Sequence, residues 1–211
     1  MRTAKISSER FRLNLSERDA ANGLYAAMKA EVERRGRAFQ FDVETRQHIL
    51  EAARWLIAQD KKIGLMLCGL YGNGKTTLAK AIANLVEYVT EREHGFSHRS
   101  HMKIITSKRI CKLCLSGERF KEQQQEYDSL FREPMLIIDD LGEEPKELMV
   151  FGMLHTPLID LISERYEHQR LTIITTNLNK SQLEEKYGKR IYDRFCEMLT
   201  PIIFTNESYR S

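Results

Sequence analysis

The residues from Gly69 to Thr77 have the types and spacing of a phosphate-binding loop. They read GLYGNGKTT and fit the pattern G-x-x-x-x-G-K-T, between an apolar run at 61–68 and an amphipathic helical pattern. Glycines without a Cβ let main-chain N–H groups surround phosphates, and the helix N-terminus adds partial positive charge. We expect Lys75 to reach the β- and γ-phosphates of a nucleotide and the Thr76 hydroxyl to face Mg²⁺. The alternative is a chance glycine-rich turn before a helix, which is rare because four positions must match.

Further polar residues follow two runs that are typical of buried strands. Asp139 and Asp140 come directly after the apolar residues 135–138, and Asn177 ends the run LTIITTN. A carboxylate at this place can lie beside Mg²⁺, so we assign that role to Asp139, and Asp140 can polarise the attacking water. Asn177 can hold that water or sense the γ-phosphate. The alternatives are an ordinary strand-to-loop turn for the two acids and a helix cap for Asn177.

Two arginines share one face of a predicted helix near the carboxyl end. Arg190 and Arg194 are spaced i, i+4 in KRIYDRFCEM, and Asp193 can orient a guanidinium. An arginine supplied by a neighbouring subunit can stabilise the charge of a phosphoryl-transfer transition state. We interpret Arg194 as that arginine, with Arg190 as its substitute; the alternative is a solvated helix face.

Four histidines and cysteines show a weaker pattern. His98-x-x-His101 and Cys111-x-x-Cys114 have the spacing of zinc ligands, but a predicted strand separates the two pairs. We therefore favour buried cysteines on a helix face over a zinc site, and we expect Cys68 and Cys196 in the core.

Strand and helix patterns alternate along the chain, which predicts a mostly parallel sheet with right-handed crossovers. The expected strands cover residues 61–68, 102–107, 135–138, 171–177 and 201–206. The expected helices cover residues 44–59, 76–93, 107–117, 118–133 and 146–170, with a bend at Pro157 in the last, followed by a helix–turn–helix around Gly188.

Length and charge predict one α/β domain with a modest extension. The chain has 211 residues; residues 1–40 carry nine Lys and Arg against five Asp and Glu, whereas the whole chain has 33 against 30. We divide it into a basic helical extension, 1–44, and an ATPase domain, 45–211. The extension can meet an anionic or protein partner, or be a solvated helical face. No apolar run is long enough to span a bilayer and no signal peptide is visible, so we expect a cytoplasmic protein with reduced thiols and no membrane contact.

The ordered motifs GLYGNGKTTLA, MLIIDDLGEE, ERYEHQRLTIITTNL, KRIYDRF and the closing SYR resemble the AAA+ ATPases of the bacterial helicase-loader type. These are the DnaC and DnaI proteins, with the IstB transposition helpers as close relatives, and the resemblance covers roughly residues 45–210. It implies a three-layer αβα P-loop NTPase fold with a five-stranded sheet, no separate lid domain, and ATP bound between the subunits of a homo-oligomer. It also implies roles for single residues: Asp139 and Asp140 as the Walker B pair, Asn177 as sensor 1 and Arg194 as the finger. The implied Walker A contacts are Gly69, Tyr71, Gly72, Asn73, Gly74, Lys75, Thr76 and Thr77, with Thr76 and Asp139 at the metal.

Three functions compete. A loader would bind single-stranded DNA and a replicative helicase, hydrolysing ATP slowly unless stimulated by DNA or its partner. Candidates for contact with the DNA are the basic residues near the second strand, Lys103, Lys108, Arg109 and Lys112; the alternative is a solvated helix face. A transposition helper would assist a transposase on double-stranded DNA. A small-molecule kinase also carries a P-loop, but the sequence after Thr176 offers an arginine-bearing helix instead of an acceptor site and lid.

Overall fold

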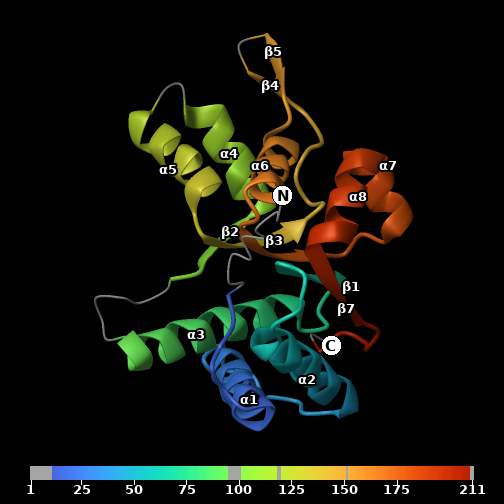
Figure 1. Ribbon diagram of the computed structural model, residues 1–211. Coiled ribbons are helices and arrows are strands. Elements are labelled where there is room, and N and C mark those ends of the chain that lie inside the picture. Colours follow the sequence, from blue (N-terminus) through green and yellow to red (C-terminus); the bar gives the residue numbers. More distant parts are fainter. Residues whose placement is uncertain (1–10, 95–100, 118–119, 151, 210–211) are drawn as a thin grey trace, which may run out of the picture.

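The computed structural model describes residues 11–94, 101–117, 120–150 and 152–209. Its centre is a five-stranded sheet in the order β2-β3-β6-β1-β7, and every neighbouring pair in it is parallel (Figure 1). The strands are β1 (Gly64–Gly69), β2 (Lys103–Thr106), β3 (Met135–Leu141), β6 (Leu171–Thr176) and β7 (Leu199–Phe204). The predicted parallel sheet is confirmed.

Helices cover both faces of this sheet (Figure 1). One face carries α1 (Glu17–Glu33), α2 (Val43–Ile57) and α3 (Lys75–His94). The other carries α4 (Ser107–Gly117), α5 (Lys121–Arg132), α6 (Pro157–Glu167), α7 (Lys180–Tyr187) and α8 (Lys189–Met198). The molecule therefore has the three αβα layers that the sequence predicted.

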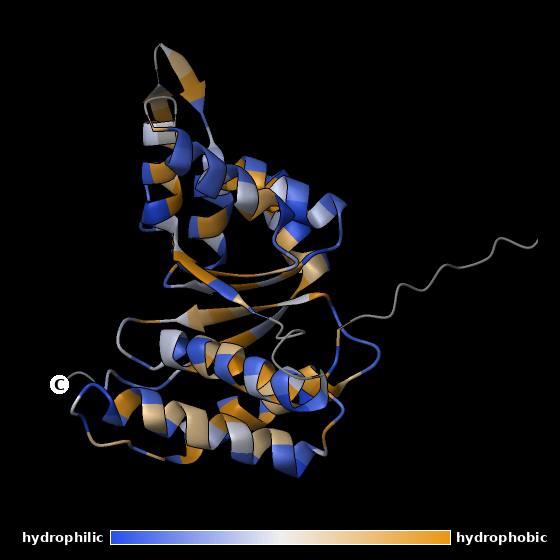
Figure 2. Cartoon of the chain, turned by 90° about the vertical axis from the view of Figure 1, so that its left-hand side faces the viewer, coloured by the Kyte–Doolittle hydropathy of each residue, from blue (hydrophilic) through white to orange (hydrophobic). Residues whose placement is uncertain are grey.

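Each helical layer has its own hydrophobic core against the sheet. Figure 2 shows hydrophobic residues, in orange, along the strands and on the helices of both layers. All six residues of β6 are buried, as a central strand covered on both faces requires. Helix α1 buries Leu24 and Met28 in the same core as α2 and α3. The predicted boundary near residues 40–45 falls between α1 and α2, and both helices pack in this one core.

Side-chain caps fix where several helices begin. Asp42 precedes α2 and accepts a hydrogen bond from the Thr45 amide at 2.7 Å. Asn179 and Gln182 form a reciprocal capping box at the start of α7. Gly188, with φ of +83°, separates α7 from α8 and confirms the predicted helix–turn–helix.

The helix predicted over residues 146–170 is wrong in nearly its first half. There, β4 (Leu148–Val150) and β5 (Met153–His155) pair as an antiparallel hairpin, and Gly152 before β5 has a φ of +81°. The helix begins only at Pro157, the first position of α6. Proline is favoured there because a first-turn N–H has no helical partner, so Pro157 starts a helix instead of bending one.

The cysteine predictions have mixed outcomes. Cys111 is buried on α4 as expected and Cys114 is half-buried, whereas Cys196 is exposed on α8, contrary to its predicted core position. His98 lies outside the described residues. Within the described ranges, no group of three or more His, Cys, Asp and Glu side chains is arranged to hold a metal ion. In the same ranges, no helix has the length and apolar character needed to cross a membrane.

Candidate nucleotide-binding site

The predicted phosphate-binding loop connects β1 to α3. Gly69, Gly72 and Gly74 have φ values of +154°, +80° and +99°, which side chains with a Cβ rarely adopt. At Gly69 a Cβ would lie 2.4 Å from the Phe204 carbonyl oxygen, so β7 leaves no room for one. These glycines therefore shape the loop, as the pattern G-x-x-x-x-G-K-T predicted.

The Lys75 ammonium lies inside the curve of this loop. It donates hydrogen bonds to the carbonyls of Gly69 at 2.8 Å and Leu70 at 2.5 Å, and to Asn73 Oδ1 at 3.0 Å. The Asn73 side chain is buried and in turn donates to the Phe204 carbonyl at 3.3 Å. The loop thus holds a buried positive charge at its centre, where it can pair with a phosphate.

Thr76 and Asp139 meet at the first turn of α3. Thr76 Oγ1 donates to Asp139 Oδ1 at 2.8 Å, and Thr175 Oγ1 on β6 donates to the same oxygen at 2.7 Å. Hydroxyl and carboxylate oxygens are the hard ligands that Mg²⁺ prefers. The donor set therefore fits the predicted ion, with Thr76 and Asp139 as the residues that would hold it. Thr175 was not predicted, because its position in a buried strand reads as ordinary core.

Asp140 lies next to this pair in an unusual backbone conformation. Its φ is +55°, and its amide donates to Thr175 Oγ1 at 2.8 Å while its carbonyl accepts from Ser107 Oγ at 2.6 Å. A non-glycine residue in the left-handed region is uncommon and gathers at functional sites. The two contacts, from β6 and from the start of α4, hold Asp140 in this conformation.

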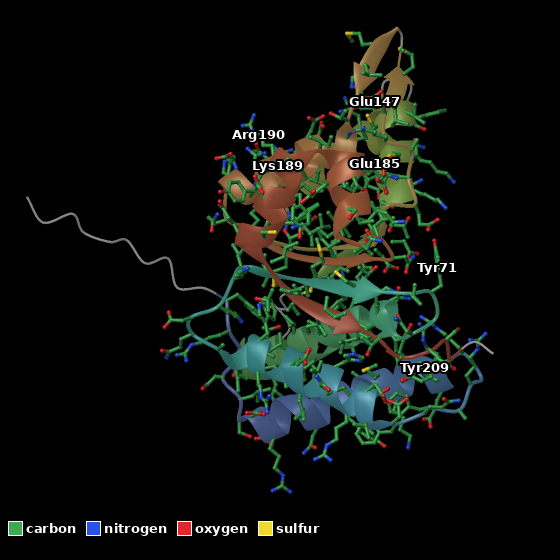
Figure 3. All side chains as sticks on the ribbon, turned by 90° about the vertical axis from the view of Figure 1, so that its right-hand side faces the viewer. Tyr71, Glu147, Glu185, Lys189, Arg190 and Tyr209 are labelled. Atoms are coloured by element: carbon green, nitrogen blue, oxygen red, sulfur yellow. The ribbon has the colours of Figure 1, made fainter. Side chains whose placement is uncertain are left out.

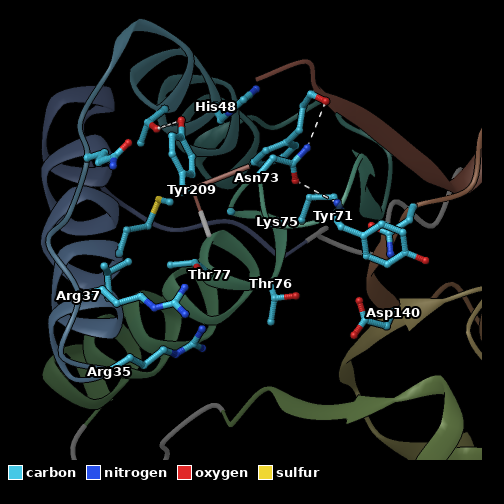
Figure 4. Close-up of a pocket in the computed structure, with 18 of the residues that line it drawn as sticks. Arg35, Arg37, His48, Tyr71, Asn73, Lys75, Thr76, Thr77, Asp140 and Tyr209 are labelled. Atoms are coloured by element: carbon cyan, nitrogen blue, oxygen red, sulfur yellow. Dashed lines mark hydrogen bonds between the residues drawn. The ribbon is translucent and has the colours of Figure 1, made fainter. Parts of the chain in front are cut away.

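A cavity of about 380 Å³ joins these residues (Figure 4). Of the predicted site residues, those that line it are Tyr71, Gly72, Asn73, Gly74, Lys75, Thr76, Thr77, Asp140 and Asn177. Asp139 and Gly69 contact residues that line the cavity: Asp139 accepts a hydrogen bond from Thr76, and the Gly69 carbonyl accepts one from Lys75. The structure therefore brings the predicted Walker A, Walker B and sensor residues together around one space.

The far wall of the cavity comes from a part of the chain that the sequence did not connect with the site. It consists of Met28, Val32, Arg35, Arg37, Ala38, Phe39 and Gln40 from α1 and the segment after it, and Thr45 and His48 from α2. Figure 4 shows the guanidinium groups of Arg35 and Arg37 directed toward Thr77 and Thr76. Arg35 forms an ion pair with Glu31, with 2.5 Å between Nη2 and Oε1. Burial raises the pKa of Glu31, but hydrogen bonds from Arg34, Arg35 and Lys80 outweigh burial and keep that pKa below its ordinary value.

The last described residues fasten this wall to the phosphate loop. The Tyr209 amide donates to the Gly72 carbonyl at 3.0 Å, and its hydroxyl donates to Asp42 at 2.6 Å. Burial, together with the bond to Asp42, raises the pKa of Tyr209 to about 12. Figure 3 shows Tyr209 and Tyr71 on the same side of the molecule. A tyrosine near the end of the chain thus connects the loop with the N-cap of α2.

The two arginines of α8 lie away from the cavity. Arg194 donates to Glu167 at 2.9 Å, its guanidinium lies 5.1 Å from the Tyr166 ring, and its side chain is 12% exposed. Arg190 is exposed, and in Figure 3 it lies with Lys189 at the opposite edge from Tyr71. Neither arginine lines the cavity of its own chain.

Comparisons with known proteins agree with this geometry. The family model described as IstB-like ATP binding protein matches residues 12–211. A solved structure of the DnaC helicase loader is 22% identical, with a TM-score of 0.61, covering 79% of this chain and 93% of that one. A DnaI structure is 21% identical, with a TM-score of 0.58, and the match covers 86% of this chain and 94% of that one. A putative primosome component from Streptococcus pyogenes serotype M3 is 18% identical, with a TM-score of 0.51 and coverage of 93% and 84%.

A search of curated proteins gave no match. The structural similarities establish the fold of AAA+ P-loop NTPases. The family match spans nearly the whole chain, including the cavity wall from α1 and α2. This chain belongs to the family of IstB-like ATP-binding proteins.

Proposed function

We propose that this protein is an ATPase of the helicase-loader type that hydrolyses ATP at the site between β1 and α3. The observation that carries the proposal is the contact between Thr76 and Asp139 at 2.8 Å, beside a loop with Lys75 at its centre. Asp140 and Asn177 line the same cavity. A triphosphate placed in this loop would lie near all five of these side chains.

The proposed reaction assigns one task to each side chain. Loop amides and Lys75 bind the β- and γ-phosphates, and Lys75 exchanges its carbonyl partners for phosphate oxygens. Thr76 and Asp139 would hold Mg²⁺, which neutralises charge on the β- and γ-phosphates. Asp140 polarises the water that attacks the γ-phosphorus, and Asn177 positions that water. The apolar wall of Met28, Val32 and Phe39 accommodates the base.

A second copy of the chain completes the proposed site. The proposal assigns Arg194 to the neighbour's γ-phosphate, which requires it to leave Glu167; Arg190 is exposed without such a change. Such an arginine contributes about 10³–10⁵ in rate in GTPases. Arg194→Ala should bind ATP normally but lose turnover, while Arg190→Ala should keep it.

Mixing two inactive variants tests the shared site. Arg194→Ala supplies an intact Asp139, and Asp139→Asn supplies an intact Arg194, so a mixed oligomer contains some complete sites. We expect the mixture to recover steady-state ATPase activity that neither variant shows alone. Normal turnover of Arg194→Ala, or no recovery in the mixture, would remove Arg194 from the site, and the same pair of assays on Arg190→Ala would then test its substitute.

For the macromolecular role, we propose a loader that binds single-stranded DNA and a replicative helicase. The proposal is supported by the fold similarity to the DnaC helicase loader over 93% of that structure. Lys108, Arg109 and Lys112 lie on α4 with exposed side chains, where they can meet a phosphate backbone. The second candidate, an ATPase that assists a transposase on double-stranded DNA, is favoured by the IstB-like family match.

Two measurements separate these candidates. A loader should bind single-stranded DNA more tightly than a duplex of the same length in ATP and Mg²⁺, and should retain a hexameric helicase in a pull-down from the native extract. Preference for duplex DNA, with capture of a transposase instead of a helicase, would support the second candidate and contradict the first.

A further inference from the structure

The loop Gly142–Glu144 follows β3, and side chains of α7 hold it in place through hydrogen bonds. Glu144 is buried, accepts a hydrogen bond from the Gly142 amide at 2.8 Å and another from the Tyr187 hydroxyl. Lys186 donates to the Gly142 carbonyl at 2.6 Å. These contacts leave the neighbouring Glu143 as the acid of this loop that faces the cavity.

The Glu143 carboxylate contacts both the phosphate loop, which binds ATP in the proposed function, and α4, which binds DNA. One oxygen accepts from the Tyr71 hydroxyl of the phosphate loop at 2.5 Å. The other pairs with Lys108 at the start of α4, at 3.2 Å. These two hydrogen bonds, first that of Tyr71, keep the pKa of Glu143 below its ordinary value. The carboxylate therefore has one partner on the phosphate loop and another on α4.

Tyr71 depends on its hydroxyl contacts for its position. Its side chain is 63% exposed, so packing restrains the ring little. Glu143 raises the pKa of Tyr71 through their hydrogen bond. Tyr71 lines the cavity together with Asn177 and Asp140, and Figure 4 shows Tyr71 and Asp140 on the same side of it.

We propose that Glu143 is a positioning residue that sets Tyr71 at the phosphate end of the cavity and couples nucleotide binding to anion binding at Lys108. The proposal rests on the proposed function, because it names how DNA on α4 would act on that ATP site. When a DNA phosphate pairs with Lys108, the ion pair between Lys108 and Glu143 is lost. The Glu143 charge is then offset less, by the more distant Lys186, and opposes the triphosphate more strongly. Because binding linkage is reciprocal, ATP must weaken DNA binding by the same factor.

The first experiment measures the dissociation constant of ATP by calorimetry with and without an oligothymidylate. DNA should raise this constant about fivefold or more in the wild type. Glu143→Gln should reduce that factor to less than twofold, because an amide carries no charge to uncover. Lys112→Met is the matched control: it removes another exposed cation of α4 and should weaken DNA binding but keep the wild-type factor. Wild-type coupling in Glu143→Gln, or its loss in Lys112→Met, would overturn the proposal.

The second experiment needs no DNA and so separates this inference from the proposed function. In a double-mutant cycle on ATP affinity, Tyr71→Phe and Lys108→Met both act through Glu143 and should be non-additive by about threefold or more. In the Glu143→Gln background their effects should become additive. Unchanged thermal unfolding of the three variants shows that the fold is intact. Additive effects in the wild-type background would overturn the inference even if DNA binding is found, whereas non-additive effects without any DNA binding would refute only the proposed DNA role.

Discussion

Thr175→Val should destabilise the protein because Thr175 joins both acids of the site. The Thr175 side chain is completely buried; its hydroxyl donates to Asp139 at 2.7 Å and accepts from the Asp140 amide at 2.8 Å. Valine has nearly the same shape, so the substitution removes these two hydrogen bonds and leaves little cavity. It also leaves a buried N–H and a carboxylate oxygen with one partner fewer.

The two losses set the expected magnitude. A hydrogen bond to a charged group contributes about 1.5–3 kcal/mol, and an unsatisfied buried amide costs about 1–3 kcal/mol. The added methyl group returns about 0.8 kcal/mol of apolar burial. The unfolding free energy should therefore fall by about 2–5 kcal/mol. In a domain of this length, that corresponds to a fall of roughly 4–20 °C in Tm.

Thermal and urea unfolding of the apo protein provide the assay, with Thr175→Ser as the matched control. Serine keeps the hydroxyl, so this variant should stay within about 1 kcal/mol of the wild type. The valine variant should also bind ATP more weakly in Mg²⁺, because Asp139 loses a donor that fixes its orientation. If Thr175→Val unfolds within about 0.5 kcal/mol of the wild type, the Thr175 bridge contributes nothing and this reasoning is wrong.

Three further perturbations test the packing around the site. Gly64→Ala would place a Cβ 1.9 Å from the Thr172 carbonyl oxygen, between neighbouring strands. We expect the unfolding free energy to fall by about 2 kcal/mol or more, or the variant to give no soluble protein. A wild-type Tm would contradict this expectation. Tyr209→Phe removes the bond to Asp42 and should cost about 1–2 kcal/mol in urea unfolding, with unchanged stability as the contrary result. Burial lowers the pKa of Lys61 to about 8 from 10.5, so the folded state penalises its charge. The wild-type unfolding free energy should therefore rise between pH 8 and 10.5 relative to Lys61→Met, and parallel pH profiles would refute this.

The sequence predicted those parts of the fold and site that local patterns encode. The continuous apolar run at 135–138 and the β-branched run at 171–176 are enough to identify strands buried on both faces. The phosphate loop and the two acids near the end of β3 are recognisable because the required residues are adjacent in sequence. The hairpin at 148–155 was missed because its short apolar strands also fit a helical pattern, and only Gly152 and Pro157 interrupt it.

Residues that reach the site through long-range contacts could not be predicted. Arg35 and Phe39 lie in the basic extension, for which the sequence left open a partner contact or a solvated helical face, yet they line the cavity because α1 packs beside α3. The motifs that contain Glu143 and Thr175 assign no role to either residue, because their contacts depend on which elements are neighbours in the fold. The pairing of Arg194 with Glu167 likewise depends on how α8 packs against α6, which no local pattern shows.

The central claim is that the Gly69–Thr77 loop binds a triphosphate through Lys75, and calorimetric titration with ATP and Mg²⁺ tests it most directly. The wild type should bind with measurable heat, and Thr76→Ser, which keeps the hydroxyl, should bind similarly. Lys75→Ala should remain folded by circular dichroism but show no binding at the same concentrations, because it lacks the buried ammonium that meets the phosphates. Binding by Lys75→Ala with the wild-type affinity would contradict the account.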